Sequence, residues 1–376
     1  MKPNAEDFVP GEIPVSVIIP AYNAERFIAQ TLTMLDHQTV RAAEIIVVDD
    51  GSTDATAAIA ETFRARVIRG RHAGRAAARN AGIAMATHDW IALLDADDIW
   101  DPNKLEAQWS LHLEQKTLDI IATDYDRIDP EGTVLRPNVV TSQHQYWTIA
   151  SQRLSGSAAL LSPRLLARSL PEWEIFLPST LLIRRSLFTR FGDFDLNVEL
   201  EDAELFLRFL KNCRAAMIER PLLGYIQHPA SVTANRSYTN SMAELARHVR
   251  KHSGRYHSAS VRALRDLLPT LLLRLAKAYA QEKHYADTVG AVLGALASAS
   301  SLETVSAYTL RAAAKHPIAR TCFLCIPWTR ETISLIPKWM STPPPREKTD
   351  WPAIITDSRT VPITDGTDSV SMTVGK

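Results

Sequence analysis

The stretch IALLDADDIWDP, residues 91–102, runs an apolar segment straight into three acidic side chains, Asp95, Asp97 and Asp98. The apolar segment belongs to DWIALLD, residues 89–95, which has the composition of a buried β-strand. Acidic groups at this spacing repel one another, so the cluster is stable only where a cation or solvent neutralises it. The stretch therefore predicts a strand that ends in a charged site.

Two further β-branched segments lie upstream, VSVIIP at 15–20 and EIIVVDD at 44–50. Stretches with helical periodicity separate the three strands, at residues 24–37, 54–64 and 74–86. A further helix is expected at 101–116, with Pro102 in its first turn. Strands that alternate with helices favour right-handed crossovers and a mainly parallel sheet covered by helices on both faces. The pattern predicts an α/β fold.

Polar side chains follow each of these strands. Tyr22 and Asn23 come after the first, Asp49 and Asp50 after the second, and the cluster that begins at Asp95 after the third. The carboxyl edge of a parallel sheet is where open α/β folds bind ligands. Three such strand ends favour one binding site over three unrelated surface loops.

The composition argues against several classes of protein. The 376 residues include 42 basic and 42 acidic side chains, so the formal net charge is zero and nucleic acid is not an expected partner. Three cysteines build neither a disulfide framework nor a four-ligand zinc site. Cys322 and Cys325 form a lone C-x-x-C, interpreted as packed thiols, and a reducing cytoplasm fits best.

The sequence predicts neither an export signal nor a membrane-spanning segment. Its N-terminus, MKPNAEDFVPGEIPV, lacks the basic start and apolar run of a signal peptide. No window reaches 18 uninterrupted apolar residues. Charged residues and prolines interrupt the apolar segment 318–340. The favoured interpretation is that this segment closes the core. The alternative is that it lies on a membrane surface through Trp328 and Trp339.

Four segments, in this order, resemble the family 2 glycosyltransferases of the GT-A fold. They are VSVIIPAYNAERFI (15–28), EIIVVDDGSTDAT (44–56), LLDADDIW (93–100) and FGDFDLNVELEDAELFLRFL (191–210). The resemblance covers about residues 13–235. The four motifs together are specific for this family, whereas a lone D-x-D motif is not. It implies a Rossmann-like, mainly parallel sheet flanked by helices, and an inverting transfer of sugar from a nucleotide-diphosphate sugar to a hydroxyl.

The resemblance places the donor and a cation at the strand ends. It makes Asp97 a direct ligand of Mn²⁺ or Mg²⁺ and sets Asp95 toward the ribose or donor sugar. For His228 there are two alternatives: it contacts the metal or a phosphate, or it has a structural role. Hard oxygen ligands suit these cations, which neutralise the departing diphosphate. The other donor-binding residues that it implies are Pro20, Tyr22, Glu25, Asp50, Gly74 and Arg79.

Three of these assignments have structural alternatives, and for Tyr22 the alternative is a side chain packed as a hydrophobic staple. The resemblance sets Asp50 against the N–H of a base, usually uracil, but the same segment also suits a turn at a helix start. Arg79 shares a helix face with Arg75, which suits phosphate and equally suits a structural ion pair. His72 stands where the family commonly has asparagine.

The segment LEDAEL (200–205) supplies the acceptor side of the resemblance. Asp202 matches the base that takes the proton from the acceptor hydroxyl, and Glu201 stands beside it. At a helix start the dipole favours the ionised carboxylate that a base requires. Trp173 either stacks on an acceptor sugar or packs in the core.

The expected organisation has four parts. Residues 1–13 form a leader, 14–240 the GT-A domain with 136–180 as a variable acceptor-side insertion, 241–340 an α-helical region and 341–376 a disordered tail. The resemblance implies a UDP-linked donor, a glycan or lipid-linked acceptor of surface polysaccharide synthesis, and a cytoplasmic location at the inner membrane face, with peripheral membrane contact left open. The alternatives are a non-catalytic nucleotide-sugar-binding protein and a nucleotidyltransferase that makes nucleotide sugars.

Overall fold

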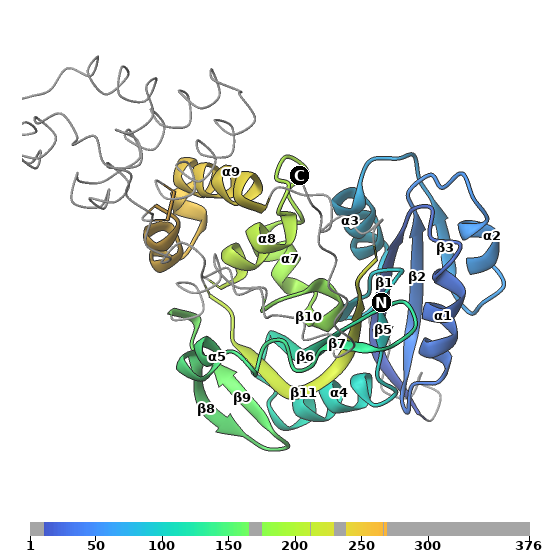
Figure 1. Cartoon of the computed structure of the whole chain (residues 1–376), viewed down its shortest axis with the longest axis horizontal. Helices are drawn as coiled ribbons and strands as arrows, with labels where there is room; N and C mark the ends of the chain where they lie inside the picture. The colour runs from blue at the N-terminus through green and yellow to red at the C-terminus, as the bar shows by residue number, and fades with distance from the viewer. Residues whose placement is uncertain (1–10, 165–174, 211, 229–237, 266, 269–376) are drawn as a thin grey trace, which may run out of the picture. The chain divides into compact units, whose positions relative to one another are not determined.

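The structure is a computed structural model of the chain, and it describes residues 11–164, 175–210, 212–228, 238–265 and 267–268. Within them, one 11-stranded sheet has the strand order β3-β2-β1-β4-β10-β6-β11-β9-β8, with β5 paired to β11 and β7 to β6 (Figure 1). The strands are β1 (Glu12–Ala21), β2 (Arg41–Asp49), β3 (Arg66–Arg69), β4 (Trp90–Leu93), β5 (Ile99–Trp100), β6 (Ile120–Ile128), β7 (Val134–Arg136), β8 (Ala150–Leu154), β9 (Ala158–Leu161), β10 (Leu182–Arg184) and β11 (Ala215–Ile226).

Helices cover both faces of the parallel part of this sheet. The helices of the described residues are α1 (Ile28–Asp36), α2 (Thr56–Ala60), α3 (Arg75–Met85), α4 (Lys104–Glu114), α5 (His144–Ile149), α7 (Ser186–Phe191), α8 (Glu201–Phe209) and α9 (Tyr238–Lys251), with the 3₁₀ turns η3 (Pro178–Thr180) and η5 (Ser253–Arg255). Figure 1 shows α3 against one face of β1 and β2, and α1 with α2 against the other. The predicted α/β class is confirmed.

The N-terminal strands form the expected parallel core. β1 pairs in parallel with β2 and β4, and β2 with β3. From Val17 to Ala21, β1 is buried throughout, as expected for a strand covered on both faces. β10 departs from the parallel pattern, because it runs antiparallel between β4 and β6.

Close packing fixes α3 on the sheet. A Cβ at Gly82 would come within 2.4 Å of Ile18 Cγ2 and 3.2 Å of Val48 Cγ2. Only glycine therefore lets the helix backbone approach β1 and β2 this closely. The position of α3 matters because its first turns reach the carboxyl edge of the sheet.

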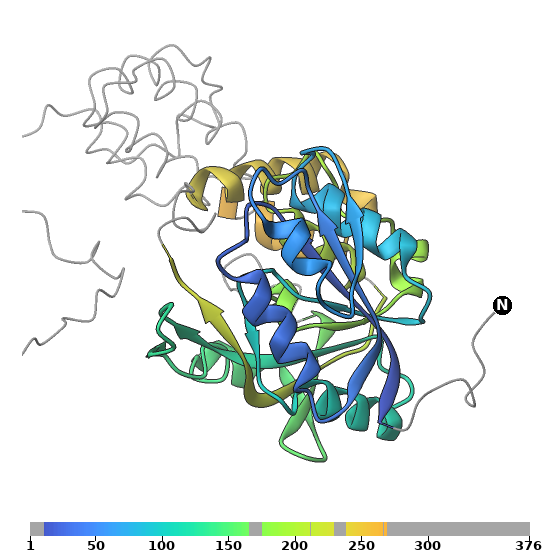
Figure 2. The same cartoon turned by 90° about the vertical axis from the view of Figure 1, so that its right-hand side faces the viewer.

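The long strand β11 bends across the sheet (Figures 1 and 2). Its register against β6 shifts on both sides of Pro221, which has no N–H to donate to the ladder. Beyond the shifts, Leu223 and Gly224 pair with Trp100 and Ile99 of β5. The bend brings the end of β11 beside the segment that follows the acid cluster.

Two predicted helices are shorter than expected. The helix predicted at 54–64 spans only Thr56–Ala60, and the one at 101–116 only Lys104–Glu114. In the second case the Asp101 carboxylate accepts a hydrogen bond from the backbone N–H of Asn103, which forms a turn ahead of the helix. Periodicity marks the apolar face of a helix better than its ends.

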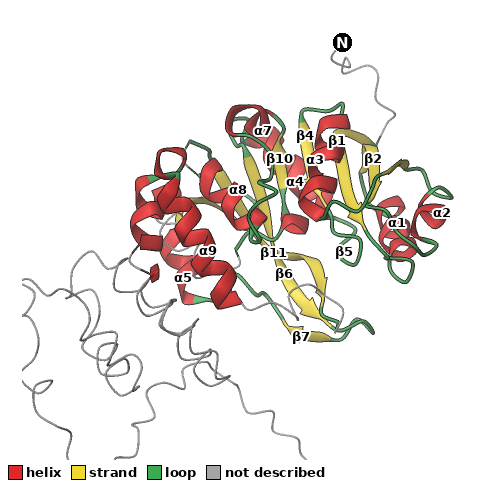
Figure 3. Cartoon of the chain, turned by 90° about the horizontal axis from the view of Figure 1, so that it is seen from above, coloured by secondary structure: helices red, strands yellow, loops and turns green. Residues whose placement is uncertain are grey.

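Helix α9 packs beside α8 (Figures 1 and 3). Its buried residues belong to the same core cluster as the sheet and are Met242, Ala243, Leu245, Ala246 and Val249. The predicted boundary at 240/241 stays a prediction, and the regions 269–340 and 341–376 lie outside the described residues. Within the described residues, no helix is long and apolar enough to cross a membrane.

Candidate active site

The acid cluster forms a tight turn at the end of β4. The backbone N–H of Asp98 donates to the Asp95 carbonyl at 3.1 Å, and the N–H of Asp95 donates to Ser179 Oγ at 2.9 Å. The turn exposes about a third of the Asp95 and Asp97 side chains, at 30% and 34%, and buries Asp98. Two carboxylates therefore face outward, and the third points into the protein.

Burial and mutual repulsion change how these carboxyls ionise. Burial, and then the charge of Asp95, raises the pKa of Asp97. Burial, and then the charges of Asp97 and Asp95, raises the pKa of Asp98 well above its usual value. Burial and the two neighbouring acids therefore favour the neutral form of Asp98.

His228 meets Asp97 at this edge although 131 positions separate them in the sequence. Its Nε2 lies 3.0 Å from Asp97 Oδ2, and its ring packs 5.0 Å from that of Phe27. An imidazole nitrogen facing a carboxylate oxygen is a donor set that Mn²⁺ accepts. Among the described residues, no group of three or more His, Cys, Asp or Glu side chains encloses a metal site, so this pair would leave further positions to phosphate oxygens or water.

Arg79 joins the acid cluster to α8. Its side chain is only 1% exposed, and its Nη2 donates to Asp95 Oδ1 at 2.6 Å while its Nη1 donates to Glu201 Oε1 at 3.1 Å. Arg75 also pairs with both oxygens of Glu201. At 1% exposure, the Arg79 side chain presents almost no surface to a phosphate.

Asp202 lies in the first turn of α8, beside this network. It is partly exposed, and Glu201 next to it is buried, at 3%. Burial, and then the charge of Glu201, raises the pKa of Asp202, while Arg75 and Arg79 oppose the rise. Although burial opposes it, the same two guanidinium groups lower the pKa of Glu201. Of the two acids, Glu201 is committed to arginines and Asp202 remains available.

Asp50 is enclosed by the turn that leads into α3. Its Oδ1 accepts from the N–H of Ala73 and its Oδ2 from the N–H of Gly74, both at 2.8 Å, and His72 Nδ1 lies 3.1 Å from Oδ2. Each carboxylate oxygen has two lone pairs, so Oδ1 keeps the capacity for one more donor. The exposed Tyr22 stacks on His72 with ring centroids 4.0 Å apart.

The loop after β1 is tied to the loop after β2. Glu25 Oε2 accepts from the N–H of Ala55 at 3.1 Å, and Asn23, with φ +48°, exchanges hydrogen bonds with Ser52 and Thr53. Pro20 is buried within β1. Glu25 and Pro20 thus shape the loop from which Tyr22 projects.

Sequence reasoning missed two residues of this edge. Ser179 holds the Asp95 backbone, and Asn80 exchanges two hydrogen bonds of 2.9 Å with the backbone of Phe194. No local sequence pattern indicates either contact, because the two residues of each contact are far apart in the sequence. Trp173 lies outside the described residues.

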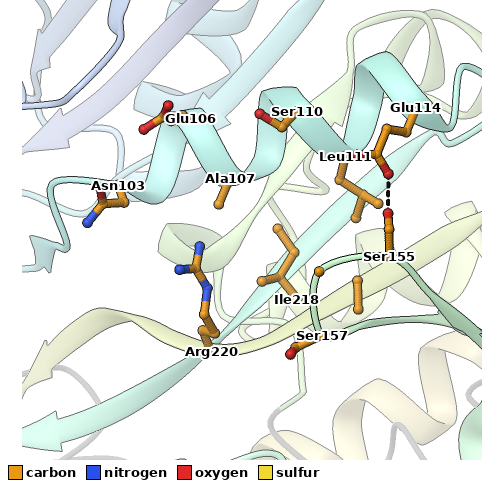
Figure 4. Close-up of a pocket in the computed structure, with 12 residues that line it drawn as sticks. Asn103, Glu106, Ala107, Ser110, Leu111, Glu114, Ser155, Ser157, Ile218 and Arg220 are labelled. Carbon is orange, nitrogen blue, oxygen red and sulfur yellow. Dashed lines mark hydrogen bonds between the residues drawn. The ribbon is translucent and has the colours of Figure 1, made fainter.

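Two cavities lie away from the acid cluster. One of about 500 Å³ opens between α4 and the β8–β9 turn, where Figure 4 shows Arg220 pointing toward α4. The other, of about 580 Å³, is lined by residues of α3, α7 and their neighbours, among them Ile83, Arg185 and Asp193. Neither includes a predicted donor or metal residue.

Comparisons with known proteins agree with the fold. The family model described as Glycosyl transferase family 2 matches residues 16–188. The chain is 34% identical over 121 residues to the glycosyltransferase GlyG of Streptococcus pneumoniae, a match covering 31% of this chain and 40% of that protein. It is 39% identical over 109 residues to the amylovoran biosynthesis glycosyltransferase AmsB of Erwinia amylovora, covering 27% and 36%. The match thus spans less than half of each relative.

A similar structure is that of S. aureus TarS 1–349 in complex with UDP-GlcNAc. It superposes with a TM-score of 0.58 at 16% identity, and the match covers 82% of this chain and 88% of that one. At this identity the likeness establishes the fold alone.

Proposed function

Because the chain belongs to the family 2 glycosyltransferases, we propose that it is an inverting, metal-dependent enzyme that transfers a sugar from a UDP-linked donor to an acceptor hydroxyl. One observation carries the proposal. The ion pairs Asp95–Arg79–Glu201 tie the acid cluster to the start of α8, so a metal-suited pair and a candidate base share one edge.

The proposed donor side consists of the loops after β1, β2 and β4. Tyr22 offers an exposed ring to the base, and the remaining lone pair of Asp50 Oδ1 accepts its N–H. Asp95 faces the ribose or sugar while Arg79 holds it in place. Gly74 contributes through its backbone, because its N–H orients Asp50. The UDP-GlcNAc complex of a protein with the same fold supports a uridine donor.

Asp97 and His228 fit a divalent cation, Mn²⁺ or Mg²⁺. The raised pKa of Asp97 reflects burial and an acidic neighbour, which a cation between the two side chains would offset. When bound, the cation supplies positive charge to the departing diphosphate. Asp97 and His228 would fix where that charge is placed, because they follow closely after β4 and β11, whose buried residues belong to the core.

Asp202 acts as the general base. Its carboxylate takes the proton from the acceptor hydroxyl as the hydroxyl attacks the anomeric carbon, and the bond to the diphosphate breaks on the opposite face. Its raised pKa makes it a better proton acceptor than an ordinary aspartate, provided that the pH keeps it ionised. No covalent sugar–enzyme intermediate forms.

The acceptor is a growing saccharide or lipid-linked saccharide. The biosynthetic name of the Erwinia relative supports a role in polysaccharide assembly. The proposed setting is the cytoplasmic face of the membrane, with Glu201 and Trp173 on the acceptor side. Glu201 contributes by holding the arginines beside Asp202 rather than through an exposed surface.

Release of UDP from a panel of UDP-sugars, with Mn²⁺ or EDTA and with saccharide acceptors, tests this function. We expect Mn²⁺-dependent turnover that EDTA abolishes, and Asp202→Asn should lower it at least about 100-fold while UDP still binds. Full activity in EDTA would contradict the metal requirement, and unchanged turnover in Asp202→Asn would exclude this base. Donor binding without any turnover would favour the non-catalytic alternative.

A further inference from the structure

We propose that Arg79 is a positioning residue, which acts through Asp95 and Glu201 to hold the carboxylate of Asp202 at the edge that binds the donor. The inference rests on the proposed function and deepens it, since it names the residue that couples the donor side to the base. It differs from the expectation that Arg79 contacts a phosphate.

The burial of Arg79 supports an indirect role. Its side chain is 1% exposed, and its two terminal nitrogens are hydrogen-bonded to Asp95 and Glu201. Its Nε is buried and, within the described part of the chain, has no hydrogen-bond partner. Asp95 belongs to the turn after β4 and Glu201 to the first turn of α8, so one side chain spans two elements far apart in sequence.

Helix α3 gives Arg79 a rigid base from which to act. Gly82 fixes α3 directly against Ile18 of β1. From the same helix, Asn80 holds the backbone of Phe194 through two hydrogen bonds of 2.9 Å, and the Arg79 guanidinium lies 5.4 Å from the Phe194 ring. The start of α8 and the segment before it are therefore attached to α3 rather than left to move with their own loop.

Charged groups on two helices influence the ionisation of Asp202. Besides burial, the charge of Glu201 on α8 raises its pKa, and the charges of Arg75 and Arg79 on α3 lower it. Asp95 lies on the far side of Arg79 and also acts on Arg75. Because Arg79 favours the ionised form of Asp202 and Glu201 disfavours it, substitution at the two positions should move the titration of Asp202 in opposite directions.

This opposition provides a test that a merely loosened helix would fail. The carboxyl carbons of aspartate are labelled with ¹³C, and the Asp202 signal is identified by its loss in Asp202→Asn. We expect the Asp202 midpoint to move to higher pH in Arg79→Met and to lower pH in Glu201→Gln. The exposed ion-pair variant Arg69→Met, whose partner is Glu61, is the matched control and should leave the midpoint unchanged.

Kinetics complete the test. In Arg79→Met the acid limb of the pH–rate profile should move with the Asp202 midpoint, and kcat should fall at least about tenfold while the Kd for UDP with Mn²⁺ changes less than about threefold. Arg79→Lys keeps the positive charge, so it should restore the Asp202 midpoint more fully than it restores kcat. If Arg79→Met does not fold, Arg79→Lys replaces it in these measurements.

Two results would overturn the inference. One is an Asp202 midpoint that stays fixed, or moves in the same direction, in Arg79→Met and Glu201→Gln. The other is a loss of UDP affinity in Arg79→Met with an unchanged midpoint, which would assign Arg79 to the phosphates. If the midpoints shift in opposite directions but the protein has no transferase activity, the coupling of Arg79 and Glu201 to Asp202 is supported and the proposed function is contradicted.

Discussion

Lys104 should make the stability of the fold depend on pH, and Lys104→Met should remove that dependence. The side chain lies fully buried in the first turn of α4, where its Nζ donates to Gln108 Oε1 at 2.8 Å and lies 4.0 Å from the Trp100 ring. No carboxylate pairs with it among the described residues. Burial lowers its pKa well below the ordinary value of 10.5.

The size of the effect follows from proton linkage. Between the lowered pKa of the folded protein and about 10.4, Lys104 is neutral when folded and takes up a proton on unfolding. The unfolded state binds the additional proton, so stability falls as the pH decreases. One proton corresponds to about 1.4 kcal/mol per pH unit within this range.

Urea unfolding at several pH values measures this slope. We expect the free energy of unfolding of Lys104→Met to depend less on pH than that of the wild type by about 1.4 kcal/mol per pH unit. The matched control is Lys251→Met, at the exposed end of α9, which should keep the wild-type slope. Parallel curves for the wild type and Lys104→Met would refute the claim that Lys104 is buried without its proton.

Three further changes test other parts of the molecule. Asp97→Asn should abolish the additional thermal stabilisation that Mn²⁺ gives in the presence of UDP, and retention of that stabilisation would exclude Asp97 as a ligand. Gly82→Ala forces the new Cβ against Ile18 and should lower the free energy of unfolding in urea by about 1–3 kcal/mol. The control Gly254→Ala places its Cβ in open space and should lower it much less. Equal effects of the two substitutions would contradict the packing argument. Tyr256 Oη donates to the buried Glu204 at 2.6 Å, so Tyr256→Phe should cost about 1.5–3 kcal/mol, and an unchanged urea midpoint would show that this hydrogen bond adds nothing to stability.

Local patterns predicted the N-terminal half of the fold well. The strands expected at 15–20, 44–50 and 89–95 lie within or across β1, β2 and β4. Each is a continuous apolar run that ends in polar residues, and a strand covered on both faces requires that pattern wherever it occurs. The segment 136–180 had no such pattern, and the structure forms the helix α5 and the β8–β9 hairpin within its described part.

The candidate site could be predicted only in part. The motifs singled out the acid cluster, Asp202 and His228, but motifs do not show which groups contact each other. The structure adds that Asp98 is buried and favours its neutral form, that Glu201 is held by two arginines, and that Arg79 has no exposed surface. These properties depend on what lies next to each group, and burial and charge then change its pKa.

The sequence by itself determined the alternation of strands and helices and the turn that carries Asp95 and Asp97, because these follow from residues adjacent in the chain. Only the tertiary structure decided that β10 runs antiparallel between β4 and β6, that His228 meets Asp97, and that Arg79 joins Asp95 to Glu201. Such contacts depend on strand order, on the bend of β11 and on the close approach of α3 to β1. These are set by the packing of distant segments, on which no local stretch of sequence carries information.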